Sequence, residues 1–497
     1  MLLLPALLSL CILYRARHRP SLSLPPGPPG RLPVLGHLLQ FPRSYEWLAY
    51  QHWSSKLGES QVYLDIIVGE HIVVLNSFRA AKDLLEGRSA LYSDRPKLFA
   101  LRDILGMDWL QGLMPFGKMF HEVRKAANKY LSSTSIKDYQ QLQLCETQKC
   151  LKKILKQPEE YVQHFRESAG GAILGAAYGI QLHAGDRYIH TVSVANAGLS
   201  FGLSAQAFIY DVFPIVKWLP DWLPGLGFRK EAQRFIGAIA ELPDLPLQET
   251  KTAMENDTAH HSIAASMLGN KTLDQNVIRT VTGTMYLAGT ETTVATLTNF
   301  ILAMVKYPEA QCKAQAEIDT VIGMGRLPDF KDEPSLPYIN ALVKEVMRWR
   351  IVTPLATPHC LIADDVYNGF HLPKDSIVIG NTFAIMHDEL LFPNPDLFIP
   401  ERYLDPAIKL PDVVFGFGSR ICPGRYFSKS LIWITIVSIL STFTISKALD
   451  EEGNELEVSD KDFTSGVVSF PVPFQCRILP RSKSTEIVLE NIESDHD

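Results

Sequence analysis

The chain has 497 residues, of which 46% are apolar and 21% are charged, a composition typical of a globular protein with a sizeable core. Its 48 basic and 54 acidic residues give a formal net charge of −6, which argues against nucleic acid as a partner. The 7 cysteines are odd in number and scattered, so the sequence predicts no disulfide framework and suits a reducing compartment.

The first 14 residues are almost all apolar, and three arginines follow them closely. This run is shorter than the roughly 20 residues that cross a bilayer comfortably. A cleavable signal peptide is the alternative, but it would carry its positive charge before the apolar run. We therefore expect an uncleaved, single-pass membrane anchor at residues 1–14 with its basic flank in the cytosol. Residues 15–30, which end in PPGPPG, are predicted to form a basic, proline-rich hinge.

Residues 31–480 are predicted to form one mixed, mainly helical domain with smaller β-sheets. The aromatic-rich stretch 201–228 either folds inward as core or dips into a membrane surface. The polar, acidic tail 481–497 is predicted to be disordered. Helices are expected at 44–57, 120–130, 273–306 and 425–443, a long connection at 92–116, and strand pairs at 62–75, 367–379 and 463–474.

A single cysteine, Cys422, lies in the glycine-rich segment FGFGSRICPG at 415–424, directly before a predicted apolar helix. The glycines at 416, 418 and 424 permit backbone conformations that a side chain forbids and allow a flat ligand to approach closely. Free N–H groups and the dipole at a helix start stabilise a thiolate. A lone thiolate cannot build a tetrahedral zinc site, but it can be the axial ligand of a haem iron. The alternative is a buried structural cysteine.

The middle of the predicted helix 273–306 carries the segment AGTETT at 288–293. Glycine inside a helix costs about 1 kcal/mol, and threonine hydroxyls can bond to the carbonyl four residues earlier and bend the helix. A local groove at this point would make room for a small molecule. Packing of small residues against a neighbouring helix is the alternative.

The segment 415–424 matches the pattern Phe-x-x-Gly-x-Arg-x-Cys-x-Gly, and with AGTETT it resembles the haem-binding loop and the acid–alcohol motif of the cytochrome P-450 superfamily. The resemblance implies the cytochrome P-450 fold and haem b (iron protoporphyrin IX) as cofactor. It also implies Cys422 as the iron ligand, and Phe415, Arg420 and Gly424 as residues that bind the haem.

Three further positions resemble functional positions of the same family. Family members usually carry Trp-x-x-x-Arg where this chain has Phe120-x-x-x-Arg124, which implies that Arg124 contacts a haem propionate and that the indole donor is lost. His359 stands where the family has a basic propionate contact, usually an arginine. For both residues the alternative is an ordinary structural role.

Glu345 and Arg348 are spaced so that they share one face of a helix. As a surface pair they would contribute little to stability. The resemblance instead implies a buried ion pair, locked by Arg402 of a later Pro-Glu-Arg-Tyr segment. Loss of one partner would then leave a buried charge uncompensated.

The resemblance extends over nearly the whole chain and is closest to microsomal members of basidiomycete type that tailor secondary metabolites. It implies a monooxygenase that inserts one oxygen atom from O2 into a small lipophilic molecule, such as a terpenoid, polyketide or indole compound. Electrons would come from NADPH through a membrane-bound cytochrome P-450 reductase, with cytochrome b5 as a second candidate donor. Lys125, Lys129 and Lys429 are candidate docking residues for the reductase. The implied location is the endoplasmic reticulum membrane, with the catalytic domain facing the cytosol.

The acid–alcohol pair bears on the alternatives to this function. Splitting of dioxygen needs two protons, and Glu291 and Thr292 would relay them through water. One rival is a haem-thiolate isomerase or dehydratase that needs no reductase. The other is a non-enzymatic haem-sensing protein. Neither rival has a use for an oxygen-linked proton relay.

Overall fold

The computed structural model describes residues 22–491, apart from 33–34, 66–69, 184, 214–215, 217, 221–226, 324 and 406–411. The predicted anchor at 1–14 and the start of the predicted hinge lie outside the described residues. None of the helices within the described ranges combines the length and the apolar character needed to cross a membrane. The chain divides into two compact units, each of which is described by itself below.

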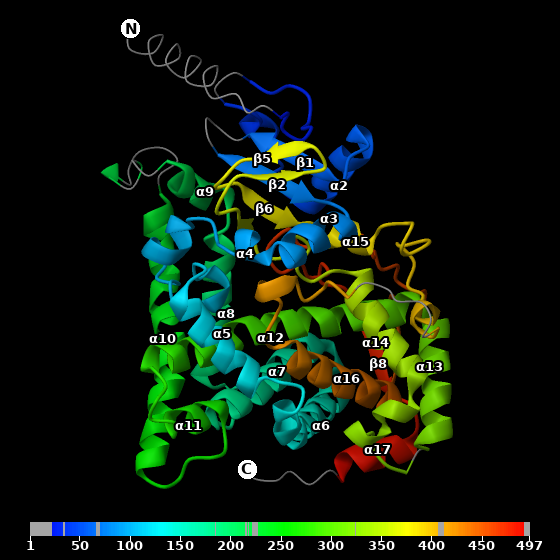
Figure 1. Cartoon of the computed structure of the whole chain (residues 1–497). Helices are drawn as coiled ribbons and strands as arrows, with labels where there is room; N and C mark the ends of the chain where they lie inside the picture. The colour runs from blue at the N-terminus through cyan, green and yellow to red at the C-terminus, as the bar shows by residue number, and fades with distance from the viewer. Residues whose placement is uncertain are drawn as a thin grey trace, which may run out of the picture. The chain divides into compact units, whose positions relative to one another are not determined.

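The smaller unit comprises Met1–Leu98, Pro354–Leu391 and Pro411–Ile421. Its centre is a four-stranded sheet in the order β1-β2-β6-β3, in which β2 and β6 are parallel and the other pairs antiparallel (Figure 1). A separate hairpin joins β4 to β5. The strands are β1 (Gln61–Asp65), β2 (His71–Leu75), β3 (His359–Cys360), β4 (Asp365–Tyr367), β5 (Phe370–Leu372) and β6 (Ile377–Gly380). The helices and helical turns are η1 (Leu38–Gln40), α2 (Glu46–Leu57), α3 (Phe78–Ala81), η2 (Lys82–Gly87), α4 (Ser89–Tyr92), α15 (Thr382–Met386) and η10 (Gly418–Arg420).

Two of the strand predictions fall in this unit; the first is confirmed and the second is wrong. The pair predicted at 62–75 is confirmed, because β1 and β2 are antiparallel neighbours rich in buried valine and isoleucine. We expected one strand pair at 367–379, and this prediction is wrong. Asn368 and Gly369, both with positive φ, close the β4–β5 hairpin, and β6 pairs with β2 and β3 in the other sheet.

The larger unit comprises Phe99–Thr353, Phe392–Leu410 and Cys422–Asp497 and is mainly helical. The predicted fold class, mainly α with smaller β-sheets, is therefore confirmed for the described residues. The helices are α5 (Lys118–Tyr130), α6 (Gln140–Lys156), α7 (Tyr161–Tyr178), α8 (Arg187–Phe201), α9 (Ala205–Val212), α10 (Phe228–Glu255), α11 (Ile263–Leu268), α12 (Gln275–Lys306), α13 (Pro308–Val321), α14 (Pro337–Trp349), α16 (Arg425–Thr442) and α17 (Lys483–Glu490). The short turns are η3 (Ala100–Ile104), η4 (Gln111–Leu113), η5 (Ser135–Tyr139), η6 (Pro158–Glu160), η8 (Phe330–Ser335) and η9 (Pro400–Tyr403), and the strands are β7 (Phe443–Lys447) and β8 (Cys476–Pro480).

Helix α12 is the central element of the larger unit. It has 32 residues, which corresponds to about 48 Å, and its neighbours include α7, α10 and α16 (Figure 1). The Asp274 side chain accepts the N–H of Asn276 at 2.7 Å and caps the start of the helix. The Tyr307-Pro308 pair ends it. The predicted helix 273–306 is confirmed to within two residues.

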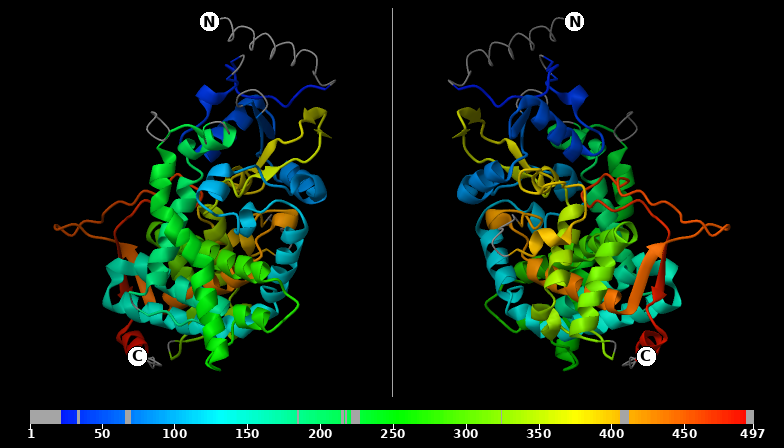
Figure 2. Two further views of the ribbon diagram at one scale, coloured as in Figure 1. Left: turned by 90° about the vertical axis from the view of Figure 1, so that its left-hand side faces the viewer. Right: turned by 90° about the vertical axis from the view of Figure 1, so that its right-hand side faces the viewer.

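The C-terminal part differs from the prediction in two ways. Within the described residues of 463–474, only an isolated bridge joins Phe463 and Pro471, and the regular pair is β7 with β8, adjacent arrows in Figure 2. The prediction of disorder for 481–497 is wrong for 483–490, which form α17. Ser482 caps this helix and Leu489 is fully buried, so an apolar face packs onto α6 and β8 despite the acidic composition. Residues 492–497 lie outside the described ranges.

The aromatic stretch 201–228 is buried in one part and exposed in another, and contact of the exposed part with a membrane stays a prediction. Tyr210 and Phe228 are buried at 1% exposure, and their rings pack at a tilt of 40° with centroids 5.2 Å apart. Phe213 and Trp218 are exposed, Trp218 at 79%. Trp222 lies outside the described residues. This stretch therefore supplies both core and exposed apolar surface.

Candidate haem-thiolate site

Cys422 lies three residues before the first residue of α16, so it directly precedes a helix as the sequence predicts. Its thiol lies in a buried environment, although the residue as a whole is only half-buried. Burial raises the pKa of this thiol, while the backbone N–H groups of Gly424 and Arg425 and the charges of Arg124 and Arg425 act in the opposite direction. Burial outweighs these groups, so the pKa of the thiol is raised overall, although the neighbouring N–H groups and positive charges act in favour of the anionic form.

The glycines around Cys422 do not all act as predicted. Gly416 and Gly418 have φ of 83° and 52°, the left-handed region that glycine adopts without strain. A Cβ on Gly418 would also overlap the carbonyl oxygen of Leu85. Gly424, by contrast, has φ of −81°, which any residue adopts, so our prediction of a special backbone there is wrong. A Cβ on Gly424 would lie 3.9 Å from the Cys422 Sγ, so what its small size preserves is space beside the sulfur.

Arg124 lies on α5, half-buried, and its charge acts on the Cys422 thiol. Burial lowers the pKa of Arg124 to about 10; the Cys422 sulfur opposes this shift and Arg425 adds to it. No acidic side chain among the described residues pairs with Arg124. Phe120 occupies the position that is usually tryptophan in the family. It is 2% exposed, and its ring packs against that of Phe116 with centroids 5.4 Å apart. A half-buried guanidinium without a protein carboxylate suits an anionic ligand.

The smaller unit contains a second basic cluster, formed by Arg95, His359 and Arg420. The Nδ1 of His359 donates to the Tyr92 carbonyl at 2.7 Å, since a carbonyl only accepts. Burial lowers the pKa of His359 well below its usual range, and the charges of Arg95 and Arg420 lower it further. The ring is therefore neutral with its proton on Nδ1, and the two guanidinium groups supply the positive charge of the cluster.

Sequence reasoning missed Arg95. The residue is 8% exposed, and its Nη1 donates to the carbonyls of Thr357 and Pro358 at 2.8 and 2.6 Å. Arg420, which was predicted, donates from Nε to the Ser93 carbonyl at 2.7 Å. The only signal for Arg95 was its place before a proline in a long connection, because its partners come from a segment far along the chain. Phe415, also predicted, is half-buried in the same unit.

The centre of α12 has one solvent-accessible stripe, the open stripe, formed by Ala288 and Thr292. Ala288 is exposed in the middle of a mostly buried helix, and Thr292, one turn further, is half-buried. The Thr292 hydroxyl donates to the Ala288 carbonyl at 2.8 Å. Thr290, Thr293 and Thr296 make the same bond four residues back, as we expected for threonines in this segment. Glu291 points elsewhere: its carboxylate pairs with Arg166 of α7 at 2.9 Å.

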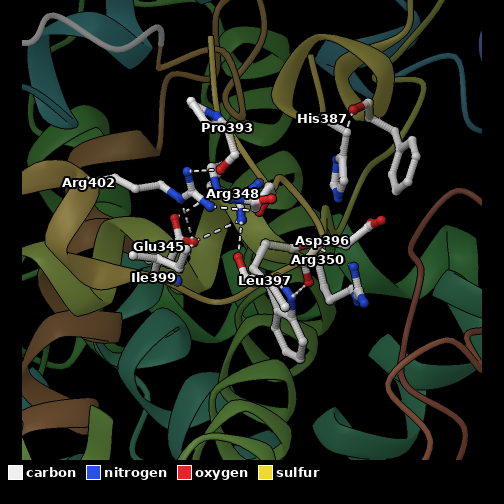
Figure 3. A network of polar contacts seen from close by, with 12 residues as sticks. Glu345, Arg348, Arg350, His387, Pro393, Asp396, Leu397, Ile399 and Arg402 are labelled. Atoms are coloured by element: carbon white, nitrogen blue, oxygen red, sulfur yellow. Dashed lines mark hydrogen bonds and ion pairs between the residues drawn. The ribbon is translucent and has the colours of Figure 1, made fainter. Parts of the chain in front are cut away.

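Glu345, Arg348 and Arg402 meet at one buried point of the larger unit. The Nε and Nη2 of Arg348 donate to the Glu345 carboxylate at 2.7 and 2.8 Å, and the Arg402 Nε lies 3.4 Å from the same group. The Ile399 N–H donates to it as well, at 2.8 Å. Figure 3 shows both guanidinium groups turned toward the carboxylate. The structure thus brings together the three residues predicted to form a buried ion pair with its lock.

Comparison with known families decides the assignment. The family model described as Cytochrome P450 matches residues 25–476. The chain belongs to the cytochrome P450 family. It is 37% identical over 484 residues to "Cytochrome P450 monooxygenase claR" of Ampulloclitocybe clavipes, with 95% of this chain and 89% of the relative covered. It is 35% identical over 498 residues to "Tryptamine 4-monooxygenase" of Psilocybe cyanescens, with 97% and 98% covered.

Membership in the cytochrome P450 family makes the chain an oxidoreductase of the monooxygenase type and implies haem b with electrons supplied by a reductase. The residues present fit this cofactor. Cys422 supplies a sulfur close to the N–H groups of Gly424 and Arg425, and a lone thiolate is the kind of ligand that haem iron takes. Within the larger unit, the charge of Arg124 also acts on this sulfur, and a guanidinium of this kind suits a carboxylate such as a haem propionate.

Proposed function

We propose that this cytochrome P450 inserts one oxygen atom from O2 into a small lipophilic substrate in fungal secondary metabolism. The candidate classes are terpenoids, polyketides and indoles, and the relative named for tryptamine supports the last. When bound, haem supplies the activation of dioxygen. The observation that carries the proposal is the Cys422 thiol at the start of α16, flanked by the N–H groups of Gly424 and Arg425 and by the Arg124 charge.

The chain's own residues have defined tasks in this proposal. Cys422 holds the iron, and Arg124, Arg95 and Arg420 hold the anionic edge of the cofactor. His359 orients the cluster through its bond to Tyr92 rather than by its own charge. Thr292, on the open stripe of α12, orients a proton donor, and Glu291 moves protons toward it.

We also propose the supply route and the location. Electrons come from NADPH through cytochrome P450 reductase, with cytochrome b5 as a second donor. The exposed Lys125 and Lys129 of α5, together with Lys429 of α16, form the docking face for an acidic partner. The enzyme resides in the endoplasmic reticulum membrane, anchored by residues 1–14 with the catalytic part in the cytosol. If so, Lys125→Glu with Lys129→Glu weakens reductase binding, and the effect shrinks at high salt.

The first test is the carbon monoxide difference spectrum of the reduced protein. Wild type and Cys312→Ser, a change at an exposed cysteine of α13, should show the thiolate-type band. Cys422→Ala should lose it. A thiolate-type band that persists in Cys422→Ala would contradict the proposal, as would its absence from wild type.

The second test separates the oxygenase from an isomerase or dehydratase. The protein is supplied with reductase, NADPH, oxygen-18 gas and a panel of terpenoid, polyketide and indole compounds. A product that carries one labelled oxygen atom supports the monooxygenase. Product formed without NADPH and without label would favour the isomerase or dehydratase instead.

A further inference from the structure

A small polar cavity lies where helices α6 and α7 of the larger unit run side by side (Figure 1). Its volume is about 30 Å³, which is room for about two water-sized groups. The lining includes two carboxylates, two ammonium groups and one imidazole, from Glu146, Glu167, Lys149, Lys153 and His164. None of these residues belongs to the candidate haem-thiolate site.

His164 carries a hydrogen-bond acceptor that no described residue uses. It lies on α7, lines the cavity and is 4% exposed. Its Nε2 lies 2.9 Å from the carbonyl oxygen of Gln157, which only accepts, so Nε2 carries a proton and donates it. In the neutral ring Nδ1 then holds a lone pair, and no donor among the described residues bonds to this atom. An unsatisfied buried acceptor is costly, so the cavity suits a ligand that donates a hydrogen bond.

The two carboxylates are more buried than the lysines that pair with them. The Glu146 side chain is 10% exposed and that of its partner Lys149 is 51% exposed. For the second pair, Glu167 and Lys153, the values are 19% and 40%. Exposed ammonium groups can turn into water at small cost, because ion pairs at the surface contribute little. The buried part of the cavity is therefore rich in acceptors.

Glu167 is charged in this setting. Burial acts to raise the pKa of its carboxyl group, but the hydrogen bonds from Lys153 and Gln163 outweigh burial, so the pKa lies below its ordinary value. The cavity thus offers a negative charge in addition to the lone pair of His164.

Together these groups select one class of ligand. A simple anion would lie against two carboxylates and would bring no hydrogen to the Nδ1 of His164. An alkali cation such as K⁺ would suit the carboxylates, but it has no hydrogen either. An ammonium group has both a positive charge and several N–H donors. Methylammonium consists of two heavy atoms, in keeping with the volume of the cavity.

We propose that the cavity between α6 and α7 binds a primary ammonium group, carried by the ammonium ion or by a small alkylamine. One N–H donates to the Nδ1 of His164, and the others donate to the carboxylates of Glu146 and Glu167. The ligand joins the two helices, so its binding stabilises the folded larger unit. This site is separate from the haem-thiolate site and does not depend on the proposed function.

The test uses the full-length, haem-loaded protein with methylammonium chloride as the probe, at constant ionic strength. At pH 8 histidine side chains are ordinarily neutral and alkylamines are protonated. The thermal unfolding midpoint should rise with probe concentration and then saturate. Potassium chloride should give no such rise, and neither should tetramethylammonium chloride, whose cation has no N–H. A methylammonium response no larger than the response to these two salts would overturn the proposal.

Two variants locate the binding site. His164→Phe keeps a ring of similar size without Nδ1, and Glu167→Gln removes a charge with little change in shape. Each should weaken binding by about tenfold or more. The matched controls are His190→Phe on α8 and Glu249→Gln on α10, both at exposed positions, and they should bind as wild type does. Wild-type affinity in both His164→Phe and Glu167→Gln would overturn the proposal.

A second measurement does not depend on unfolding. Saturation-transfer NMR of the methyl protons of the probe gives its affinity for each variant, so Glu167→Gln decides the question if His164→Phe does not fold. Because a free amine can also bind haem iron, the haem absorbance band is followed in the same samples and should stay unchanged. A band shift that follows the whole binding curve and persists in Glu167→Gln would place the amine on the iron and overturn the proposal. A crystal structure grown with the probe that shows only water beside Nδ1 would overturn it too.

Discussion

Arg348 and Glu345 face each other one turn apart on α14, joined by two hydrogen bonds, with neither side chain exposed to solvent. Arg348 also donates to the Leu397 carbonyl at 3.1 Å, and Arg402 to that of Asn394 at 2.7 Å. One carboxylate therefore ties α14 to the irregular segment 392–404. The arrangement is sensitive because every member of the network depends on that single buried acid.

Arg348→Ala should destabilise the larger unit by about 3–5 kcal/mol, because it leaves the Glu345 carboxylate buried beside only the more distant Arg402. The thermal unfolding midpoint and the haem content of the purified protein measure the effect. Lys313→Ala, which removes an exposed partner of Glu401, is the control and should behave as wild type. A fully stable, haem-loaded Arg348→Ala protein would show that the network is dispensable.

Two glycines of α12 should respond differently to alanine. At Gly283 a Cβ would lie 2.7 Å from the Cβ of Pro243 and 3.1 Å from the Trp109 ring, both of which are rigid. At Gly289 the nearest atom is the mobile end of Ile173. We expect Gly283→Ala to lower the free energy of unfolding by about 1–3 kcal/mol. Gly289→Ala should stay within about 1 kcal/mol of wild type, because the higher helix propensity of alanine offsets the close contact of its Cβ with Ile173. Denaturant unfolding of the two variants checks this, and the reverse order would refute it.

Arg95→Gln should weaken haem retention more than overall folding, if this arginine binds an anionic edge of the cofactor. The shorter amide loses the bonds to the Thr357 and Pro358 carbonyls and removes one of the two positive charges of the cluster. Haem loss to an excess of an acceptor protein is the measurement, and we expect a several-fold faster rate. Arg79→Gln, at an exposed arginine of the same unit, is the control. Equal rates in both variants would assign Arg95 a purely structural role.

Asp211 should make stability depend on pH. Burial raises the pKa of this carboxyl to about 7, with Asp103 adding to the shift and the N–H groups of Ala100 and Phe99 opposing it. The folded state thus holds the proton more tightly than the unfolded state, so this contribution to stability is present at low pH and is lost as pH rises through about 7. Asp211→Asn keeps an acceptor for Ala100 without the charge. The free energy of unfolding of this variant, relative to that of wild type, should increase by about 1–2 kcal/mol from pH 5 to pH 8, as measured by denaturant unfolding. A pH-independent difference would exclude this titration.

Local patterns predicted the parts of the fold that depend on local interactions. Helix α12 follows from apolar spacing and a stop at Tyr307-Pro308, and β1 with β2 from a short valine-rich hairpin. Strand β6 could not be placed in this way, because its partner β2 lies far earlier in the chain. Helix α17 was missed because we judged the tail by its acidic composition and overlooked the Ser482 cap and the apolar side chain of Leu489.

The candidate site shows the same division. Cys422, Arg420 and Gly418 stand in one contiguous segment, so the sequence predicted them together. Arg95 and Arg166 carry no local signature, since each acquires its importance from a partner brought close by folding. The direction of the Glu291 side chain could not be predicted either, because it depends on the ion pair with Arg166 of another helix.

The cap at Ser482 has a practical consequence for handling the protein. Truncation before residue 483 would uncover the patches of α6 and β8 that Leu489 shields, and newly exposed apolar surface of this kind promotes self-association. An affinity tag or fluorescent fusion should therefore leave α17 intact.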